Sequence, residues 1–233
     1  MKTKFGQCLS IALDGLEGTK VETQAHICAG LPSTTIVGLP DTVLQESKDR
    51  VKAAIISCGL PWTEYRLTIN LIPAFIKKTG SGFDLPIAIA ILLAQGIIDK
   101  TKLRNMAFIS ELGLDGKLQA IQGILPMVIA AKSMKITKLI VAKNNLSEAR
   151  LIDNIEVLAF DHLAEVINYF GGKLTIDISQ LKTKNVPIKS EMVKLVSQTD
   201  DFIDVLGQDS VKYALMVAAA GRHNVYMVGP PGV

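Results

Sequence analysis

The chain has 233 residues, of which 48% are hydrophobic and 20% are charged, and its net charge is +3. This length allows one large domain, or one domain with part of another, and the apolar fraction suffices for a packed core. Because only 5% of the residues are aromatic, the core must be mainly aliphatic. A charge of +3 is too small to indicate nucleic-acid binding on its own.

Cysteines and histidines are few and widely separated. They are Cys8, Cys28, Cys58, His26, His162 and His223. No two of them have the spacing of a zinc site, so we predict reduced thiols, no disulfide framework and no metal ligands. The longest apolar stretch, 85–98, is shorter than the roughly 20 residues that span a bilayer. Together with the lack of a signal-peptide core, this predicts a cytoplasmic protein.

The first sixty residues predict strands followed by a helix. Residues 7–14 and 19–29 alternate apolar and polar side chains, as half-buried strands do, and Asp14-Gly15 marks the turn between them. A third short strand is expected at 34–37. The helix that follows is expected at 41–57.

The helix at 41–57 carries both an apolar and a charged set of side chains. Thr42 and Gln45 have the spacing of a capping box at its start. Lys48, Arg50 and Lys52 are expected to face solvent. The expected apolar face consists of Val43, Leu44, Val51, Ala54, Ile55 and Cys58.

Strand and helix patterns then alternate up to residue 169. Strands are expected at 66–71, 106–110, 138–142 and 155–159, and helices at 85–94, 125–134, 147–151 and 162–169. Asp84 is expected to cap the buried helix that follows it, and Leu114–Lys117 to form a hairpin turn. The alternation predicts an α/β fold with a mixed sheet.

A second unit is expected after a lysine-rich linker. Residues 208–220 predict a helix and 224–228 a short strand, which runs into Gly229-Pro230-Pro231-Gly232-Val233. A phosphate-binding loop has the pattern G-x-x-x-x-G-K-[ST] after a strand. Gly229 matches its first glycine, so we expect the first part of such a loop, without its Lys and Ser/Thr. The alternative is an ordinary Pro-Gly turn.

Several ordered motifs together resemble a known family. They are G-L-P-D at 38–41, E-S-K-D-R-V at 46–51, N-L-I-P-A at 70–74, G-S-G-F-D-L-P-I-A at 80–88, E-L-G-L-D-G at 111–116, G-Q at 207–208, A-A-A-G-R-H-N at 218–224 and G-P-P-G at 229–232. The chain resembles the ComM/YifB family, also called magnesium-chelatase-like AAA+ proteins, over essentially its whole length.

The resemblance implies an N-terminal domain at 1–172 with the ribosomal-S5-domain-2-like fold, similar to the Lon protease domain. It implies a linker at 173–199 and the start of an AAA+ ATPase domain at 200–233. Family members are ATP-driven hexamers that use Mg²⁺, and ComM acts as a helicase in DNA branch migration during natural transformation. The implied partial ATP site consists of Gly207, Gln208, Gly229, Pro230, Pro231, Gly232 and Val233.

The Lon-like peptidase chemistry is not expected. Lon-type domains pair a Ser nucleophile with a Lys, and at the matching positions this chain has Gly82, with Ser81 one place away, and Leu125. Lys117 and Lys132 are the nearest amines in sequence, but neither is at the matching place. A metal-chelatase activity rests on the family name alone, since no ligand cluster supports it.

Two roles are left open for the chain. It is expected to be part of an ATP-driven motor that by itself does not hydrolyse ATP, or a stand-alone, non-enzymatic interaction module. Candidate DNA contacts are Lys48, Arg50, Lys52, Lys77 and Lys78, although an ordinary solvated residue is the favoured interpretation for each.

Overall fold

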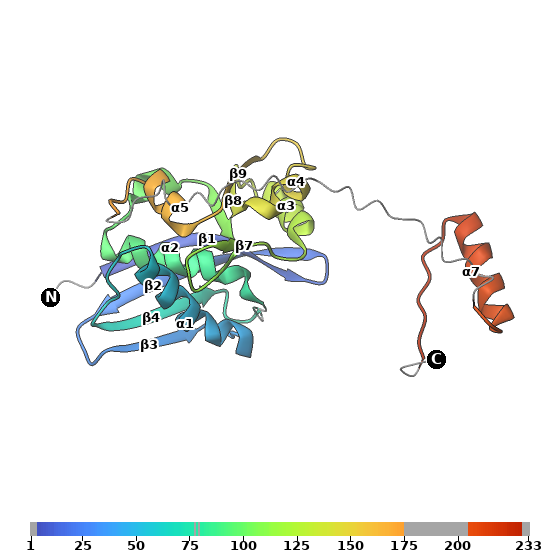
Figure 1. The fold of residues 1–233 in the computed structure, drawn as a ribbon, viewed down its shortest axis with the longest axis horizontal. Helices are drawn as coiled ribbons and strands as arrows, with labels where there is room; N and C mark the ends of the chain where they lie inside the picture. The colour runs from blue at the N-terminus through green and yellow to red at the C-terminus, as the bar shows by residue number, and fades with distance from the viewer. Residues whose placement is uncertain (1–3, 77, 79, 175–204, 230–233) are drawn as a thin grey trace. The chain divides into compact units, whose positions relative to one another are not determined.

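The computed structural model describes residues 4–76, 78, 80–174 and 205–229. The chain divides into two units, 1–182 and 183–233 (Figure 1). The predicted linker at 173–199 lies almost entirely outside the described residues, so its bounds stay a prediction.

A seven-stranded sheet in the order β3-β4-β2-β1-β5-β8-β9 forms the centre of the first unit. Its strands are β1 (Lys4–Asp14), β2 (Glu17–Cys28), β3 (Ser33–Val37), β4 (Arg66–Ile72), β5 (Met106–Ile109), β8 (Lys138–Ala142) and β9 (Glu156–Phe160). The pairs β1–β2 and β2–β4 are antiparallel, and the other four neighbouring pairs are parallel. The sheet is therefore mixed and mostly parallel, as expected for the α/β class.

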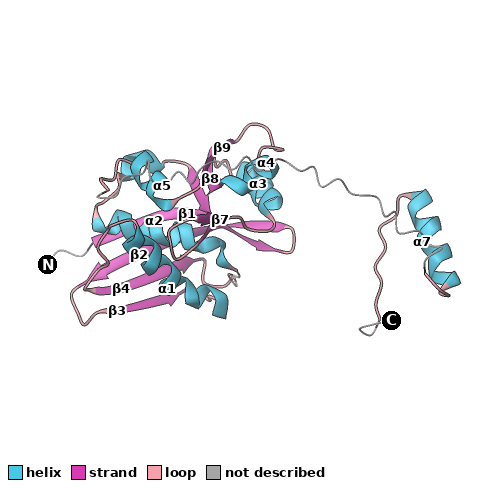
Figure 2. Ribbon diagram, viewed as in Figure 1, coloured by secondary structure: helices cyan, strands magenta, loops and turns pink. Residues whose placement is uncertain are grey.

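Helices and short turns connect these strands (Figure 2). They are α1 (Thr42–Ser57), η1 (Ser81–Phe83), α2 (Asp84–Gln95), η2 (Lys100–Leu103), α3 (Ile124–Ser133), η3 (Lys143–Asn145), α4 (Leu146–Ala149) and α5 (Leu163–Tyr169). The strands β6 (Glu111–Leu112) and β7 (Leu118–Gln119) form a separate hairpin, which confirms the turn predicted at Leu114–Lys117.

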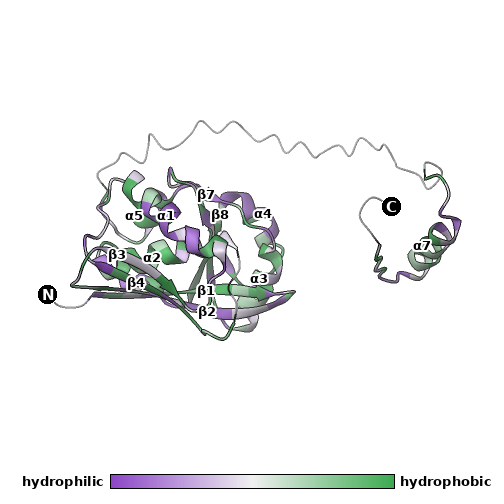
Figure 3. Cartoon of the chain, turned by 90° about the horizontal axis from the view of Figure 1, so that it is seen from below, coloured by the Kyte–Doolittle hydropathy of each residue, from purple (hydrophilic) through white to green (hydrophobic). Residues whose placement is uncertain are grey.

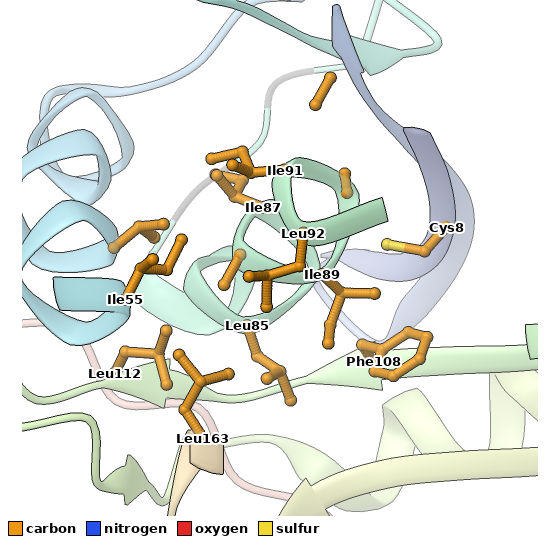
Figure 4. Packing of buried hydrophobic residues seen from close by; sticks show 14 of the residues in the cluster. Cys8, Ile55, Leu85, Ile87, Ile89, Ile91, Leu92, Phe108, Leu112 and Leu163 are labelled. Atoms are coloured by element: carbon orange, nitrogen blue, oxygen red, sulfur yellow. The ribbon is translucent and has the colours of Figure 1, made fainter. Parts of the chain in front are cut away.

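Two apolar clusters lie on opposite faces of the sheet. In the larger, α1, α2 and α5 pack on the buried side chains of β1, β2 and β4. In the smaller, α3 and α4 pack on β5, β8 and Ile11 of β1. The larger cluster centres on α2, where every residue from Asp84 to Ala94 is buried; Figure 4 shows part of this packing around Leu85 and Ile89. The buried core helix predicted from the sequence is confirmed.

The starts of two helices differ from the sequence prediction. The N-cap of α1 is Asp41, whose Oδ1 accepts a hydrogen bond from the Leu44 N–H at 2.7 Å, so the capping box of Thr42 and Gln45 is wrong. A carboxylate can satisfy that N–H directly, which removes the need for a threonine cap. Asp84 is not a cap either, because α2 begins at this residue and Phe83 is at its N-cap.

The second unit contains one described helix, α7 (Asp209–Gly221), which confirms the prediction at 208–220 within a residue. Residues 224–228 form no strand and pair with no other part of the described chain, so the strand expected there is wrong. An extended segment becomes a β-strand only through hydrogen bonds to a neighbouring strand. Among the described parts of the chain, no helix is long and apolar enough to cross a bilayer.

Candidate functional site

The described residues of the expected ATP site flank α7. Gly207 and Gln208 directly precede the helix in left-handed conformations, with φ of +73° and +56°. Gly229 follows the exposed segment after the helix, and Pro230, Pro231, Gly232 and Val233 lie outside the described residues. Within 205–229 no hydrogen bond joins Gly207 or Gln208 to the end of the segment. The arrangement thus shows the residues flanking a helix and does not bring them together.

The surface of α7 is largely apolar. None of its residues is buried. Its exposed large side chains are Val211, Tyr213, Met216 and Val217. A helix with such a surface is normally covered by another element of its domain.

The first unit contains a cleft beside the loop that precedes α2. The cleft has a volume of about 480 Å³ and is lined by Gly80, Ser81 and Gly82, by Glu111, and by side chains of β1 and α3. Ser81 Oγ donates a hydrogen bond to Glu111 Oε2. The sequence analysis missed Glu111 as a partner of this serine, although it opens the E-L-G-L-D-G motif, because only the fold brings residues 30 positions apart together.

No lysine is among the described residues that line this cleft, and the amines of Lys78 and Lys117 are engaged elsewhere. Lys78 is fully buried, and its Nζ donates to the backbone oxygens of Gly38, at 2.9 Å, and of Pro73. Burial lowers the pKa of Lys78, because the charged ammonium loses its hydration. Lys117 Nζ pairs with Asp115 at 3.1 Å. Ser81 is thus bonded to a carboxylate and to no amine of the described residues.

Arg50 and Asp84 form an ion pair that fixes α1 to the start of α2. Arg50 Nε and Nη2 donate to Asp84 Oδ2 and Oδ1 at 2.7 and 3.0 Å, and Arg50 Nη2 also donates to Ser47 Oγ. The Leu112 N–H donates to Asp84 Oδ2 at 3.2 Å. Burial raises the pKa of the Asp84 carboxyl, and the donors from Arg50 and Leu112 act against that rise. The pair therefore ties α1, α2 and β6 together behind the cleft.

This geometry corrects two of the candidate DNA contacts. Arg50 is bound to Asp84 and does not extend into solvent, and Lys78 has no exposed surface. Asp41 links the start of α1 to the loop before α2, because its Oδ2 accepts the Gly80 N–H at 3.1 Å. Sequence alone gave no sign that two of five basic residues satisfy buried acceptors. Lys52 remains exposed, Lys48 is half-buried, and Lys77 lies outside the described residues.

Two family models match the chain. Residues 22–145 match subunit ChlI of Mg-chelatase, and residues 201–233 match magnesium chelatase, subunit ChlI. The first match covers the sheet from β2 through the end of β8.

Three relatives align over nearly the whole chain. An uncharacterised protein of Mycobacterium tuberculosis is 39% identical over 229 residues, which are 98% of this chain and 44% of the relative. The competence protein ComM of Haemophilus influenzae is 35% identical over 94% of this chain and 42% of its own length. The uncharacterised protein YifB of Escherichia coli is 38% identical over 94% of this chain and 41% of its own length.

The chain thus spans less than half the length of these relatives. The regions matched by the two family models contain all of the ordered motifs, from G-L-P-D at 38–41 to G-P-P-G at 229–232. The chain belongs to the ComM/YifB family of magnesium-chelatase-like proteins.

Proposed function

We propose that this chain is the N-terminal part of an ATP-driven DNA motor of the ComM/YifB type. One observation carries the proposal: the magnesium-chelatase match at 201–233 falls on α7 and on the glycines at its two sides. In a complete motor, Gly229–Val233 would begin the loop around the ATP phosphates, and Gly207 and Gln208 would lie near the adenine. The uncovered apolar side chains of α7 are consistent with a helix that packs inside a larger ATPase domain.

ATP and Mg²⁺ are the cofactors of the complete motor in this proposal. Phosphoryl transfer needs the loop Lys to neutralise the phosphates and the Ser/Thr to hold Mg²⁺. The 233 residues contain Gly229 but no such Lys-Ser/Thr pair after it. We therefore propose that the 233-residue polypeptide alone does not hydrolyse ATP. We also propose that the complete motor assembles as a hexamer on DNA.

The first unit, in this proposal, has the ribosomal-S5-domain-2-like fold and serves interaction. The bond between Ser81 and Glu111 argues against a Lon-type peptidase. The serine of such a peptidase gives its proton to a desolvated lysine amine, whereas Ser81 is bonded to a carboxylate. A stand-alone interaction module is the second candidate. It is supported by the two apolar clusters of the first unit, which give that unit a core of its own.

Phosphate release from ATP tests the motor. We expect the 233-residue chain to release no phosphate above the blank. A longer protein that continues through a Gly-Lys-Ser/Thr sequence should hydrolyse ATP, and faster with single-stranded DNA. In that longer protein, Gly229→Val should abolish turnover, because backbone N–H groups must approach the phosphates there. The matched control Gly15→Ala, in the β1–β2 turn of the first unit, should leave turnover unchanged.

Either of two results would contradict the proposal. One is turnover by the pure 233-residue chain. The other is a longer protein that carries the full loop, folds, and still releases no phosphate with or without DNA. That second result would favour the interaction module.

A further inference from the structure

Over most of its antiparallel half, the sheet has one face that no helix of the described residues covers. The helices α1 and α2 lie on the other side of β1, β2 and β4 (Figure 3). On the side away from α1 and α2, α3 packs against Ile11 of β1 and against Gly18 of β2, near the turn that joins the two strands. The first half of β1, the second half of β2, and β3 and β4 therefore present every second side chain to solvent.

The strand register arranges these side chains in rows. One row contains Phe5, His26 and Thr68, which are paired partners in β1, β2 and β4. The next row contains Gln7, Gln24 and Asn70. Directly paired residues lie side by side on one face of a sheet. The open face thus combines an aromatic ring and an imidazole with a neighbouring row of three amides.

The amides are oriented by hydrogen bonds along the face. Asn70 Nδ2 donates to Gln24 Oε1 at 3.2 Å, and Gln24 Nε2 donates to Glu22 Oε1 at 2.5 Å. Phe5 is half exposed. This face therefore offers hydrogen-bonding groups and a stacking surface, and its charged residues Glu22 and Arg66 lie in the rows on either side of these two rows.

Two further cations lie at the edge of this face, next to β1. Leu9 pairs with Ala107 in parallel, so the chain just before β5 lies beside the first half of β1. There Lys100 and Arg104 form the wall of a pocket of about 570 Å³, whose floor includes Gln7, Leu9 and Glu22. Both cations are exposed, and neither forms an ion pair with any carboxylate of the described residues.

Unpaired cations beside a face of amides and rings fit one class of ligand. Cations without an ion-pair partner attract phosphates. A flat sheet face that carries amides and rings suits bases whose edges and faces are free. The bases of a duplex are stacked and paired, so they cannot lie flat on a sheet. Glu22 is the one carboxylate among the residues lining the pocket, against the two cations of the wall. The charge balance of the pocket is therefore positive.

We infer that the open face of β1, β2 and β4, with the wall formed by Lys100 and Arg104, binds single-stranded DNA. Phosphates lie at the wall, and bases lie on the rows that begin with Phe5 and Gln7. This inference deepens the proposed DNA motor and rests on it, but it concerns a surface of the first unit and needs no ATP.

Fluorescence anisotropy of a labelled oligothymidine tests the surface with the 233-residue chain. We expect the double variant Lys100→Glu/Arg104→Glu to weaken binding at least tenfold. It should also reduce the slope of log K against log salt by about 1.4, because each lost phosphate contact with a single strand contributes about 0.7. Phe5→Ala should weaken binding at least fivefold and leave the salt slope unchanged, since a stacking contact releases no counterion.

A matched double variant separates this surface from general charge effects. Lys132→Glu/Arg150→Glu makes the same change in net charge on α3 and directly after α4, which cover the parallel half of the sheet. We expect it to change affinity less than twofold. Far-UV circular dichroism of all variants checks that each one folds.

Cys28 provides an independent readout, because it lies on the open face of β2, beside Arg66 of β4. Cys8 and Cys58 are buried, and burial raises the pKa of Cys58 to about 12, so both react slowly with a maleimide. We expect oligothymidine to slow the labelling of Cys28 in the wild-type chain and not in the Lys100→Glu/Arg104→Glu variant.

Three results would overturn the inference. The first is equal weakening by the two double variants. The second is tighter binding of oligouridine or duplex DNA than of oligothymidine. The third is a loss of self-association, seen by light scattering, in the Lys100→Glu/Arg104→Glu variant without a change in anisotropy, which would assign the face to a second copy of the chain. None of these results bears on ATP hydrolysis, so a failure here is distinct from a failure of the motor proposal.

Discussion

The helices α2 and α7 have similar lengths and largely apolar sequences, but their burial differs. In α2, all residues from Asp84 to Ala94 are buried between the sheet and its covering helices (Figure 4). In α7, none is buried. The first helix is held by a core that its own unit provides. The second, in our proposal, is held by an ATPase domain of which 205–229 is a small part.

The comparison shows what an apolar helix indicates. Both sequences predict a helix correctly, because helix formation depends on local pattern. Burial depends on which other residues are present, and only the first unit supplies them within the described chain. Stability should therefore respond strongly to changes in α2 and weakly to matched changes in α7.

The largest difference is expected for a core truncation. Ile89→Ala in α2 should lower the free energy of unfolding by about 4 kcal/mol, since it leaves a cavity in a fully buried cluster. Val217→Ala in α7 should change it by less than about 0.5 kcal/mol. Urea unfolding followed by circular dichroism measures both. Equal effects would mean that α7 is buried by a contact within this chain, and the comparison would fail.

The first residue of each helix gives the next test. Asp84→Ala should cost about 3 kcal/mol, because Arg50 and the Leu112 N–H would lose their buried acceptor. Asp209→Ala removes an exposed carboxylate that interacts only with the helix dipole, so about 0.5 kcal/mol is expected. Thermal unfolding measures both changes. Asp84→Asn, which keeps the acceptor oxygen but not the charge, should fall between them. If it equals Asp84→Ala, the charge is what matters.

The N-caps sharpen the comparison at a smaller scale. Asp41→Ala should cost about 1.5 kcal/mol, because this side chain caps α1 and also accepts the Gly80 N–H. Gln208 makes no side-chain cap bond to α7, so Gln208→Ala should have no measurable effect on the unfolding midpoint. Asp41→Asn keeps one acceptor oxygen for the cap of α1 but not a second for the Gly80 N–H, so it separates the two contributions. A midpoint for Asp41→Ala equal to that of the wild type would show that the loop at 78–80 is held by other contacts.

The smallest effect is expected at Ser81. Ser81→Ala should lower stability by less than about 1 kcal/mol, the usual worth of one half-buried hydrogen bond. A fluorophosphonate probe should not label Ser81, because its hydroxyl is bonded to the Glu111 carboxylate and to no lysine amine of the described residues that could take its proton. Mass spectrometry of the treated protein checks this. Labelling of Ser81 that disappears in Ser81→Ala would restore the peptidase alternative.

Most elements were predictable from the sequence because their patterns are local. The alternation in β1 and β2, the apolar run of α2 and the strand at 138–142 each agree with the structure within a few residues. The failures involve partners distant in sequence. Arg50 was expected in solvent, but its acceptor Asp84 is 34 residues away. Residues 224–228 have the composition of a strand, but a strand exists only with a neighbour.

The candidate sites show the same difference between local patterns, which the sequence reveals, and partners distant in sequence, which it does not. The glycines at 207 and 229 could be identified from a motif, whereas the described residues 205–229 do not bring them together. The pairing of Ser81 with Glu111, and the wall of Lys100 and Arg104 beside β1, could not be predicted, because no short-range pattern records which strands become neighbours. Only the parallel register of β1 and β5 places that wall.

That same register also has a consequence for synthesis of the chain. Leu9 of β1 pairs with Ala107 of β5, so one edge of β1 has no partner until roughly the first hundred residues have left the ribosome. By then the hairpin of β1 and β2 can already have formed, because its strands are adjacent in sequence. A nascent chain therefore carries an unpaired β-edge for much of its elongation, and such edges associate readily with other chains. Slow translation between β4 and β5 should make this protein depend more heavily on chaperones that bind ribosomes.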